Sequence, residues 1–147
     1  MATFQKPKKL EISAQHWEEM RAEAERNKPV ECCGLLAGTA RKGVYRVMKV
    51  IPTTNILRSP VSYQLDPQEQ LKAFIDLEER GWELAGIYHS HPQGPEEPSP
   101  TDISEAYYPE AVYLVWCGCT GAWTCRGFLI QNQLVREIPI QVKGGKG

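Results

Sequence analysis

The chain has 147 residues, 41% of them hydrophobic, which fits one domain with a single ordinary core. Its formal net charge of −1 provides no basic excess for attracting phosphate, so we do not expect a nucleic-acid partner. The basic start is followed by charged residues, and no stretch of about 18 apolar residues occurs. We therefore expect a cytoplasmic protein with neither a signal peptide nor a membrane span.

The five cysteines form no regular framework along the chain. They are Cys32, Cys33, Cys117, Cys119 and Cys125. Paired C-x-x-C units of the zinc-ribbon type are absent, and an odd number of cysteines suits reduced thiols inside a cell. We expect small buried hydrophobic residues here, with a redox or metal-ligand role as the alternative.

A first helix is predicted over residues 13–27. Trp17, Met20 and Ala24 recur at helical spacing and form one apolar face. His16 lies beside this stripe without a second ligand at metal-binding spacing. It is therefore expected to be an ordinary surface or half-buried residue.

A second helix is predicted over residues 67–80. Asp66 is its expected N-cap, Pro67 occupies the first helical position and Glu69 completes a capping pattern. Gly81 provides the expected C-terminal stop. The inner face is predicted to consist of Leu71, Phe74, Ile75 and Leu77.

Strands are predicted where apolar or alternating segments lie between glycine and proline residues. These segments are residues 30–38, 44–51, 83–89, 112–117, 122–130 and 134–138. A short helix is expected to begin at Ser99 and to end near Tyr108. One domain over residues 1–142 should precede a flexible tail at 143–147, which predicts a single-domain α/β protein.

Two of the three histidines indicate a metal site. His89 and His91 stand two residues apart on an extended segment, so their side chains leave the same side about 6.6 Å apart along the backbone. Catalytic zinc takes three nitrogen or oxygen ligands from the protein and leaves one position open. Asp102, in the first turn of a capped helix, is the expected third ligand because its backbone holds it in place. Glu96 and Glu97, in the intervening loop, are expected to be solvated surface charges.

Hydrolysis at such a site also requires a base that is not itself a ligand. Glu31, at the entrance of an otherwise apolar strand, is the candidate, and a plain charged strand end is the alternative. Ser99 is expected to cap the short helix. Its hydroxyl has a second possible role, as donor to a developing oxyanion.

The complete pattern resembles the signature of the JAMM, or MPN-plus, metalloproteases, in particular their compact prokaryotic branch. It consists of His-Ser-His-Pro at 89–92, Ser99 after seven intervening residues, Asp102 after two more, and Glu31 on an upstream strand. The resemblance implies a fold similar to cytidine deaminase, with a curved mixed sheet flanked by helices.

The resemblance also implies a role for each site residue. One zinc ion would be held by His89, His91 and Asp102, with Glu31 as general acid and base and Ser99 as oxyanion stabiliser. Members of the family that the chain resembles hydrolyse the amide bond after the C-terminal Gly-Gly of ubiquitin or ubiquitin-like proteins, and the similar prokaryotic enzymes act on small ubiquitin-like modifiers or on sulfur-carrier proteins. We therefore expect a zinc-dependent peptidase or isopeptidase whose partners are a ubiquitin-like or sulfur-carrier protein and its conjugates.

Two other functions are compatible with this fold. The first is a non-catalytic MPN scaffold that binds a ubiquitin-like partner, although such domains typically lack the ligands that are present here. The second is a zinc nucleobase deaminase, whose His-x-Glu and Pro-Cys-x-x-Cys motifs are absent. For the peptidase, residues 61–65 are expected to pair with the glycine tail of the substrate by β-addition. The sequence does not specify an oligomeric state.

Overall fold

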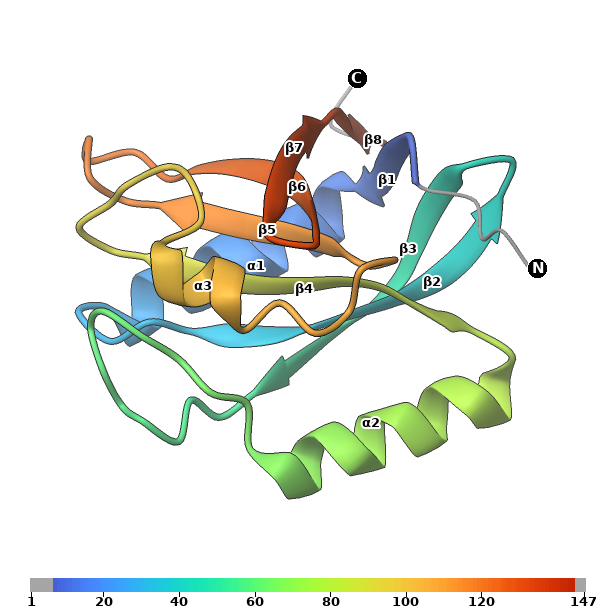
Figure 1. Ribbon diagram of the computed structural model, residues 1–147, viewed down its shortest axis with the longest axis horizontal. Coiled ribbons are helices and arrows are strands. Elements are labelled where there is room, and N and C mark those ends of the chain that lie inside the picture. Colours follow the sequence, from blue (N-terminus) through green and yellow to red (C-terminus); the bar gives the residue numbers. More distant parts are fainter. Residues whose placement is uncertain (1–6, 145–147) are drawn as a thin grey trace.

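One curved sheet with helices on both faces makes up residues 7–144, the part of the chain that the computed structural model describes (Figure 1). The helices are α1 (Ala14–Asn27), α2 (Pro67–Arg80) and α3 (Pro100–Ser104). The strands are β1 (Lys9–Ser13), β2 (Cys33–Arg41), β3 (Val44–Thr53), β4 (Glu83–His91), β5 (Val112–Cys117), β6 (Thr124–Gln131), β7 (Leu134–Ile138) and β8 (Ile140–Lys143). This architecture confirms the predicted α/β class.

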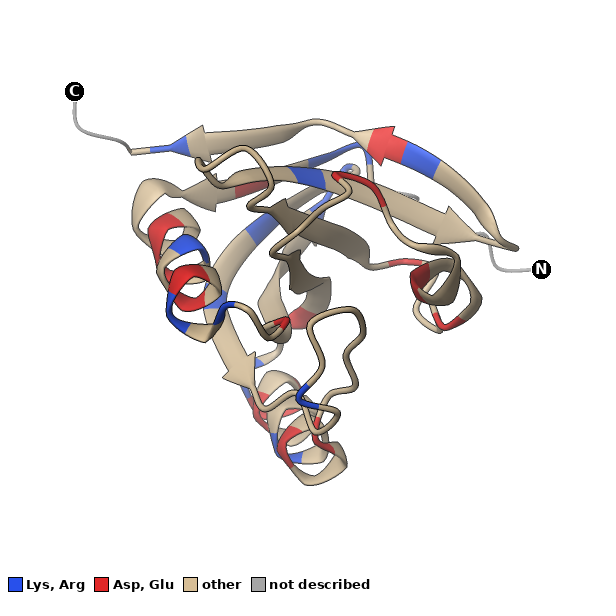
Figure 2. Cartoon of the chain, turned by 90° about the vertical axis from the view of Figure 1, so that its left-hand side faces the viewer, with Lys and Arg blue, Asp and Glu red and all other residues tan. Residues whose placement is uncertain are grey.

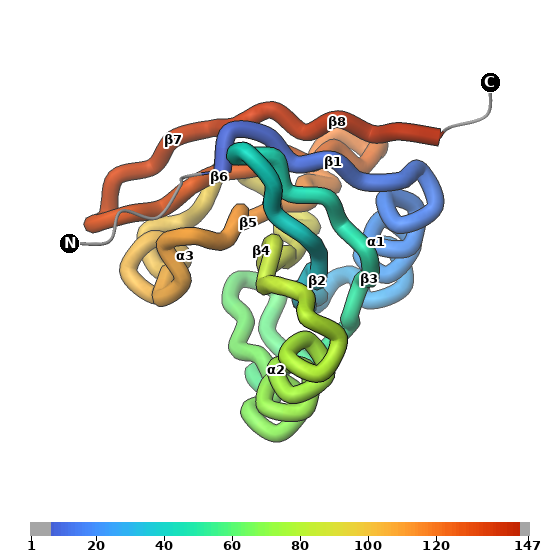
Figure 3. The backbone as a smooth tube through the Cα atoms, turned by 90° about the vertical axis from the view of Figure 1, so that its right-hand side faces the viewer, coloured from blue at the N-terminus to red at the C-terminus, as the bar shows by residue number. Residues whose placement is uncertain are grey.

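The described strands run in the order β7-β6-β5-β4-β2-β3-β1-β8. The pairs β1–β3, β1–β8 and β4–β5 are parallel and the other pairs are antiparallel, so the sheet is mixed, as predicted. The two edge strands, β7 and β8, are joined only by Pro139, whose carbonyl accepts a hydrogen bond from the Leu10 N–H at 3.1 Å. Because one continuous segment forms both edges, the sheet must curl until its ends meet, as Figure 3 shows.

The two faces of the sheet carry separate apolar clusters. Met20 and Ala24 of α1 pack in one cluster, and Ala73 of α2 belongs to the other. Since successive residues of a strand point to opposite faces, Ile87 and Tyr88 of β4 contribute to different clusters. Alternation along β4 therefore decides which side chains meet α1 and which face α2 and α3.

Helix α1 follows the prediction closely. Its N-cap is Ser13, whose hydroxyl accepts the His16 N–H at 3.0 Å, and Met20 and Ala24 are fully buried. Trp17 is partly buried and stacks at a tilt on Trp116, with ring centroids 4.7 Å apart. His16 is half-buried, as expected.

Helix α2 has the predicted limits but a different inner face. The Asp66 side chain accepts the first free N–H groups, and Gly81 ends the helix at φ 70°. The prediction that Leu71 and Ile75 lie inside is wrong, because they are 61% and 50% exposed. The buried residues, Ala73 and Leu77, lie one turn apart, and at about 100° per residue this places positions 71 and 75 on the far side.

Helix α3 is shorter than predicted, ending at Ser104 and not near Tyr108. The chain leaves the helix because Tyr108 is held elsewhere: its N–H donates to the Tyr113 hydroxyl at 3.1 Å, and its ring contacts Phe74 edge-on at 5.9 Å. These contacts fix the segment between α3 and β5 against α2.

The two strands that sequence patterns did not predict, β1 and β8, are short and pair with each other. Their register joins Ser13 to Lys143, and the Lys143 ammonium lies 3.2 Å from the Glu11 carboxylate. Lys143 was expected in the tail and is instead the last residue of β8. Residues 145–147 of the expected tail lie outside the described residues, so the domain limit at 142 stays a prediction.

Acidic and basic residues are mixed along α1 and α2 (Figure 2). These two helices therefore present no surface of a single sign of the kind that steers polyanions. Among residues 7–144, every helix is too short or too polar to span a membrane.

Candidate metal centre

The site is built at the carboxyl end of β4. Strand alternation places His89 and His91 on the same face as Ile87, toward α2 and α3. Both histidines are almost fully buried, with exposed fractions of 1% and 4%. Neighbouring strands β2 and β5 pair with this end of β4, so the two imidazoles rise from the rigid centre of the sheet.

Asp102 reaches the histidines from α3 because of a complete capping box. The Ser99 hydroxyl accepts the Asp102 N–H at 3.0 Å, and Asp102 Oδ2 accepts the Ser99 N–H at 2.9 Å. These reciprocal bonds fix the carboxylate on the first turn. The predicted cap role of Ser99 is confirmed.

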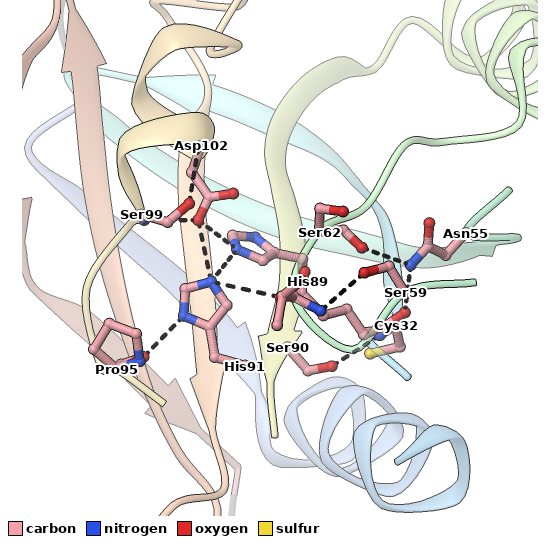
Figure 4. Close-up of polar contacts among 12 residues, drawn as sticks. Cys32, Asn55, Ser59, Ser62, His89, Ser90, His91, Pro95, Ser99 and Asp102 are labelled. Atoms are coloured by element: carbon pink, nitrogen blue, oxygen red, sulfur yellow. Dashed lines mark hydrogen bonds and ion pairs between the residues drawn. The ribbon is translucent and has the colours of Figure 1, made fainter. Parts of the chain in front are cut away.

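Three potential ligand atoms meet at one point (Figure 4). His89 Nε2 lies 3.0 Å from His91 Nε2 and 3.0 Å from Asp102 Oδ2, and the third side of the triangle is 3.1 Å. Ligands about 2.0–2.1 Å from a tetrahedral zinc ion lie about 3.3 Å from each other. The triangle thus already has nearly the size that such an ion requires.

Hydrogen bonding also leaves the correct nitrogen of His91 free. Its Nδ1 donates to the Pro95 carbonyl at 2.8 Å, since a carbonyl can only accept. In the neutral ring this leaves a lone pair on Nε2, which points into the triangle. His89 Nδ1 and Glu31 Oε1 are buried and find no hydrogen-bond partner among the described residues. The donor set therefore fits a divalent metal ion.

Glu31 lies beside the triangle. Its Oε2 is 4.0 Å from His91 Nε2, and the ligand atoms of Glu31, His89 and His91 all lie within 4.8 Å of one another. The backbone of Glu31 is fixed by two bonds, with its N–H donating to the Ser59 carbonyl at 2.9 Å and its carbonyl accepting from Asn55 Nδ2 at 3.0 Å. The Asp102 carboxylate is about 1 Å closer to the imidazole nitrogens than the Glu31 carboxylate is. Asp102 is therefore better placed to be the third ligand, and Glu31 lies next to the ligand set without belonging to it.

The two carboxyl groups are in different electrostatic states. Burial raises the pKa of Glu31 to about 7; His91 opposes this shift and Asp102 adds to it. Burial also acts to raise the pKa of Asp102, but hydrogen bonds from His89 and His91 outweigh it and hold that pKa well below its ordinary range. Two carboxyls with pKa values driven apart can serve as a fixed anion and as a proton carrier.

Burial lowers the pKa of His89, against the hydrogen bond to Asp102. For His91 burial acts in the same direction, but the bonds to Asp102 and to the Pro95 carbonyl raise the pKa overall.

Sequence reasoning missed three residues that shape the site. Tyr63 stacks on His89, with ring centroids 4.4 Å apart and an interplanar angle of 21°. Asn55 is buried and orders the loop after β3, and the Pro95 carbonyl orients His91. Tyr63 and Asn55 act through partners distant in sequence, His89 and Glu31. Pro95 is only four residues from His91, but it acts through its main-chain carbonyl, which no residue pattern distinguishes.

The intervening loop behaves as predicted at its acidic residues. The side chains of Glu96 and Glu97 are 46% and 67% exposed. Each carboxylate lies 3.6 Å from the guanidinium of Arg126 on β6. They are surface charges that tie this loop to the sheet.

A groove of about 400 Å³ extends from Asp102 between α2 and α3. Its walls are mostly apolar and aromatic, and include Leu35, Tyr63, Leu65, Ile87, Tyr107 and Tyr113. An extended peptide lying in this groove would therefore reach Asp102, the one residue of the triangle that lines it.

Known proteins are similar to this chain in sequence and in fold. Residues 13–126 match the family model described as prokaryotic homologs of the JAB domain. The chain is 40% identical over 124 residues to the CysO-cysteine peptidase of Mycobacterium tuberculosis, with 84% of each chain covered. It is 37% identical over 116 residues to the desampylase of Haloferax volcanii, covering 78% of this chain and 80% of that protein.

A solution structure of a protein from Desulfitobacterium hafniense has a TM-score of 0.83 to this chain at 36% sequence identity, covering 91% of this chain and 92% of the other. These matches confirm the predicted fold and the predicted enzyme class, a JAMM-type hydrolase. The chain belongs to the family of prokaryotic JAB-domain proteins.

Proposed function

We propose that this protein is a zinc-dependent peptidase or isopeptidase that hydrolyses the amide bond after the C-terminal Gly-Gly of a ubiquitin-like or sulfur-carrier protein. The triangle of His89, His91 and Asp102, with Glu31 beside it, is the observation that carries the proposal. Relatives named CysO-cysteine peptidase and desampylase support the substrate class. The expected cytoplasmic location is part of this proposal.

Zinc held by His89, His91 and Asp102 would act as a Lewis acid and would lower the pKa of water toward neutrality. The capping box orients Asp102, the Pro95 carbonyl orients His91, and the Tyr63 ring stacks on His89. The chain's own contribution is therefore a preorganised donor set.

Glu31 is proposed to accept the proton of the attacking water and to pass it to the departing amine. Its carboxyl is 3% exposed, and a pKa near 7 suits a group that must both take and give a proton at neutral pH. One of its oxygens has no hydrogen-bond partner among residues 7–144, which leaves that oxygen free for this role.

Ser99 is proposed to donate its hydroxyl proton to the oxyanion of the tetrahedral intermediate. Its oxygen accepts the Asp102 N–H, so the hydroxyl hydrogen remains free for another acceptor. Capping and oxyanion stabilisation are thus compatible in the same side chain.

The substrate tail is proposed to lie in the groove beside Asp102. A Gly-Gly segment is thin enough to pass between aromatic walls such as Tyr63 and Tyr113. Pairing of the tail with residues 61–65 stays a prediction; in this segment Leu65 forms a single isolated bridge with Asn55, and Val61 is 77% exposed.

The test uses a ubiquitin-like protein extended by a short peptide beyond Gly-Gly, incubated with the purified protein with and without a chelator. Cleavage after Gly-Gly should stop in the chelator and return when zinc is added back. Glu31→Gln should be inactive, whereas Glu97→Gln, an exposed glutamate of the nearby loop, should retain full activity. Cleavage that persists in the chelator or in Glu31→Gln would overturn the proposed function.

A further inference from the structure

Two cysteines lie together at the end of β5, next to the metal centre. Cys117 is the last residue of the strand and is buried, and Cys119 is exposed two residues later. Both are free thiols, and their sulfur atoms are 2.6 Å apart. A pair of thiols at this distance is arranged for joint chemistry, which a lone buried cysteine is not.

The other three cysteines are held in apolar or hydrogen-bonded environments. Burial raises the pKa of Cys32 and of Cys33 to about 12, and burial also raises the pKa of Cys125 well above its ordinary value. These thiols match the expectation of small buried hydrophobic residues. Cys119 does not match it, because it is exposed and therefore accessible to reagents in solution.

The cysteine pair contacts the loop that orients His91. Strands β4 and β5 pair His91 with Cys117, and the His91 carbonyl accepts N–H groups from Gly118 at 3.2 Å and from Gly94 at 2.9 Å. A Cβ atom on Gly94 would lie 3.3 Å from the Cys119 sulfur, so this backbone rests directly on the pair. The next residue, Pro95, holds the His91 ring.

We propose that Cys117 and Cys119 form a redox-active dithiol that closes reversibly to an intramolecular disulfide by exchange with a low-molecular-weight disulfide. The exposed Cys119 thiolate attacks one sulfur of the small disulfide, forming a mixed disulfide and releasing one small thiolate. The Cys117 thiolate then attacks the Cys119 sulfur and releases the second. The two protein thiols lose two electrons and two protons, and the small disulfide is reduced to two thiols.

The spacing favours closure within one chain. An S–S bond is about 2.05 Å long, so the two sulfurs need only a short movement, and the intervening Gly118 carries no side chain to oppose it. The buried partner is in place before the exposed one reacts, which favours attack on the mixed disulfide over its persistence. The site is separate from the proposed peptidase reaction, and its chemistry does not require a metal ion.

The test equilibrates the native protein with reduced and oxidised glutathione at fixed ratios, traps free thiols by alkylation, and measures intact mass and the disulfide-linked peptide. Under oxidising ratios the wild-type chain should fall from five free thiols to three and lose two hydrogens in mass, and dithiothreitol should restore both. Cys125→Ser should fall from four thiols to two. Cys119→Ser should form no disulfide, and Cys117→Ala should stop at one glutathione adduct.

Three results would overturn the proposal: five free thiols at every ratio, a wild-type protein that stops at a glutathione adduct, or a disulfide that joins two chains. Near-ultraviolet circular dichroism of Cys119→Ser distinguishes loss of exchange from misfolding, because Cys119 is exposed and this variant should keep the wild-type spectrum. Since thiol number and mass are measured without a substrate, failure here leaves the proposed peptidase untouched, and the reverse also holds.

Discussion

Replacing Glu31 by glutamine should separate proton transfer from metal binding at this site. The substitution keeps the shape of the side chain and removes its ability to accept a proton. Glu31 stands 4.0 Å from His91 Nε2, whereas the three triangle atoms are 3.0–3.1 Å apart, so the ligand set stays complete. Zinc content should therefore remain at the wild-type level while turnover falls.

The magnitude follows from the role of a positioned general base. Such groups contribute about 10²–10⁴-fold to rate, which corresponds to roughly 3–5 kcal/mol of transition-state stabilisation. Stability should not fall with activity, because the Glu31 carboxyl is buried, its Oε1 has no partner among residues 7–144, and burial raises its pKa to about 7. At pH 8 the folded metal-free protein carries an unfavourable buried charge that glutamine removes.

The assay is single-turnover cleavage of a fusion extended beyond Gly-Gly, with zinc measured by atomic absorption and unfolding measured in urea. Glu97→Gln, with a side chain 67% exposed, is the matched control and should behave as wild type in all three measurements. A Glu31→Gln enzyme whose single-turnover rate constant is within tenfold of wild type, or one that loses zinc as a ligand variant does, would refute the assigned role.

Three further outcomes follow from the contacts. Asp102→Ala should reduce zinc content to near zero by atomic absorption and lower the free energy of unfolding by about 1 kcal/mol, because it removes a ligand and half of a capping box; retained zinc would contradict the ligand set. The Glu23 carboxyl accepts a hydrogen bond from the Tyr88 hydroxyl, and burial raises its pKa to about 7. The protonated form of Glu23 therefore contributes its full stability below pH 4.5, and this stability is lost as the pH rises through 7. Glu23→Gln should gain on the order of 1–3 kcal/mol over wild type between pH 4.5 and 7.5 in urea unfolding, and parallel curves would exclude this. Asn55→Ala removes four hydrogen bonds and should lower the free energy of unfolding by about 2–4 kcal/mol. It should also lower kcat, because Glu31 would be displaced; an unchanged kcat would show that this loop does not position Glu31.

The predictability of the fold differs between its elements for physical reasons. Segments with strong local patterns, such as the capped helix after Asp66 and the apolar strand that begins at Glu83, are found from sequence because their own residues encode them. Strands β1 and β8 lack such patterns, and they exist because the curled sheet brings its two ends together. The rotation of α2 about its axis is likewise determined by tertiary packing, since contact with the sheet buries Ala73 and leaves Leu71 exposed.

The three proposed ligands could be predicted because two of them share one strand and the third is fixed by a capping box whose residues lie in the same helical turn. Glu31 is different, since locally it is only a charge at a strand entrance, and it became the candidate base because the predicted metal site requires one. Its position follows from the register between β2 and β4, which continues to Cys32 and Ser90, 58 positions apart in the sequence. The Cys32 N–H donates to the Ser90 hydroxyl at 2.8 Å, and the Ser90 N–H donates to the Cys32 carbonyl at 3.1 Å.

This pair of bonds sets which side of the sheet Glu31 occupies. With Cys33 opposite His89, continued alternation puts Glu31 opposite His91 and on the same face. A register slip of one residue would turn every β2 side chain to the other face and place the Glu31 carboxyl toward α1. Ser90, between the two histidines, therefore contributes to the site through its hydrogen bonds to Cys32. These bonds fix the strand register that keeps Glu31, the proposed proton carrier, beside the proposed ligands His89 and His91.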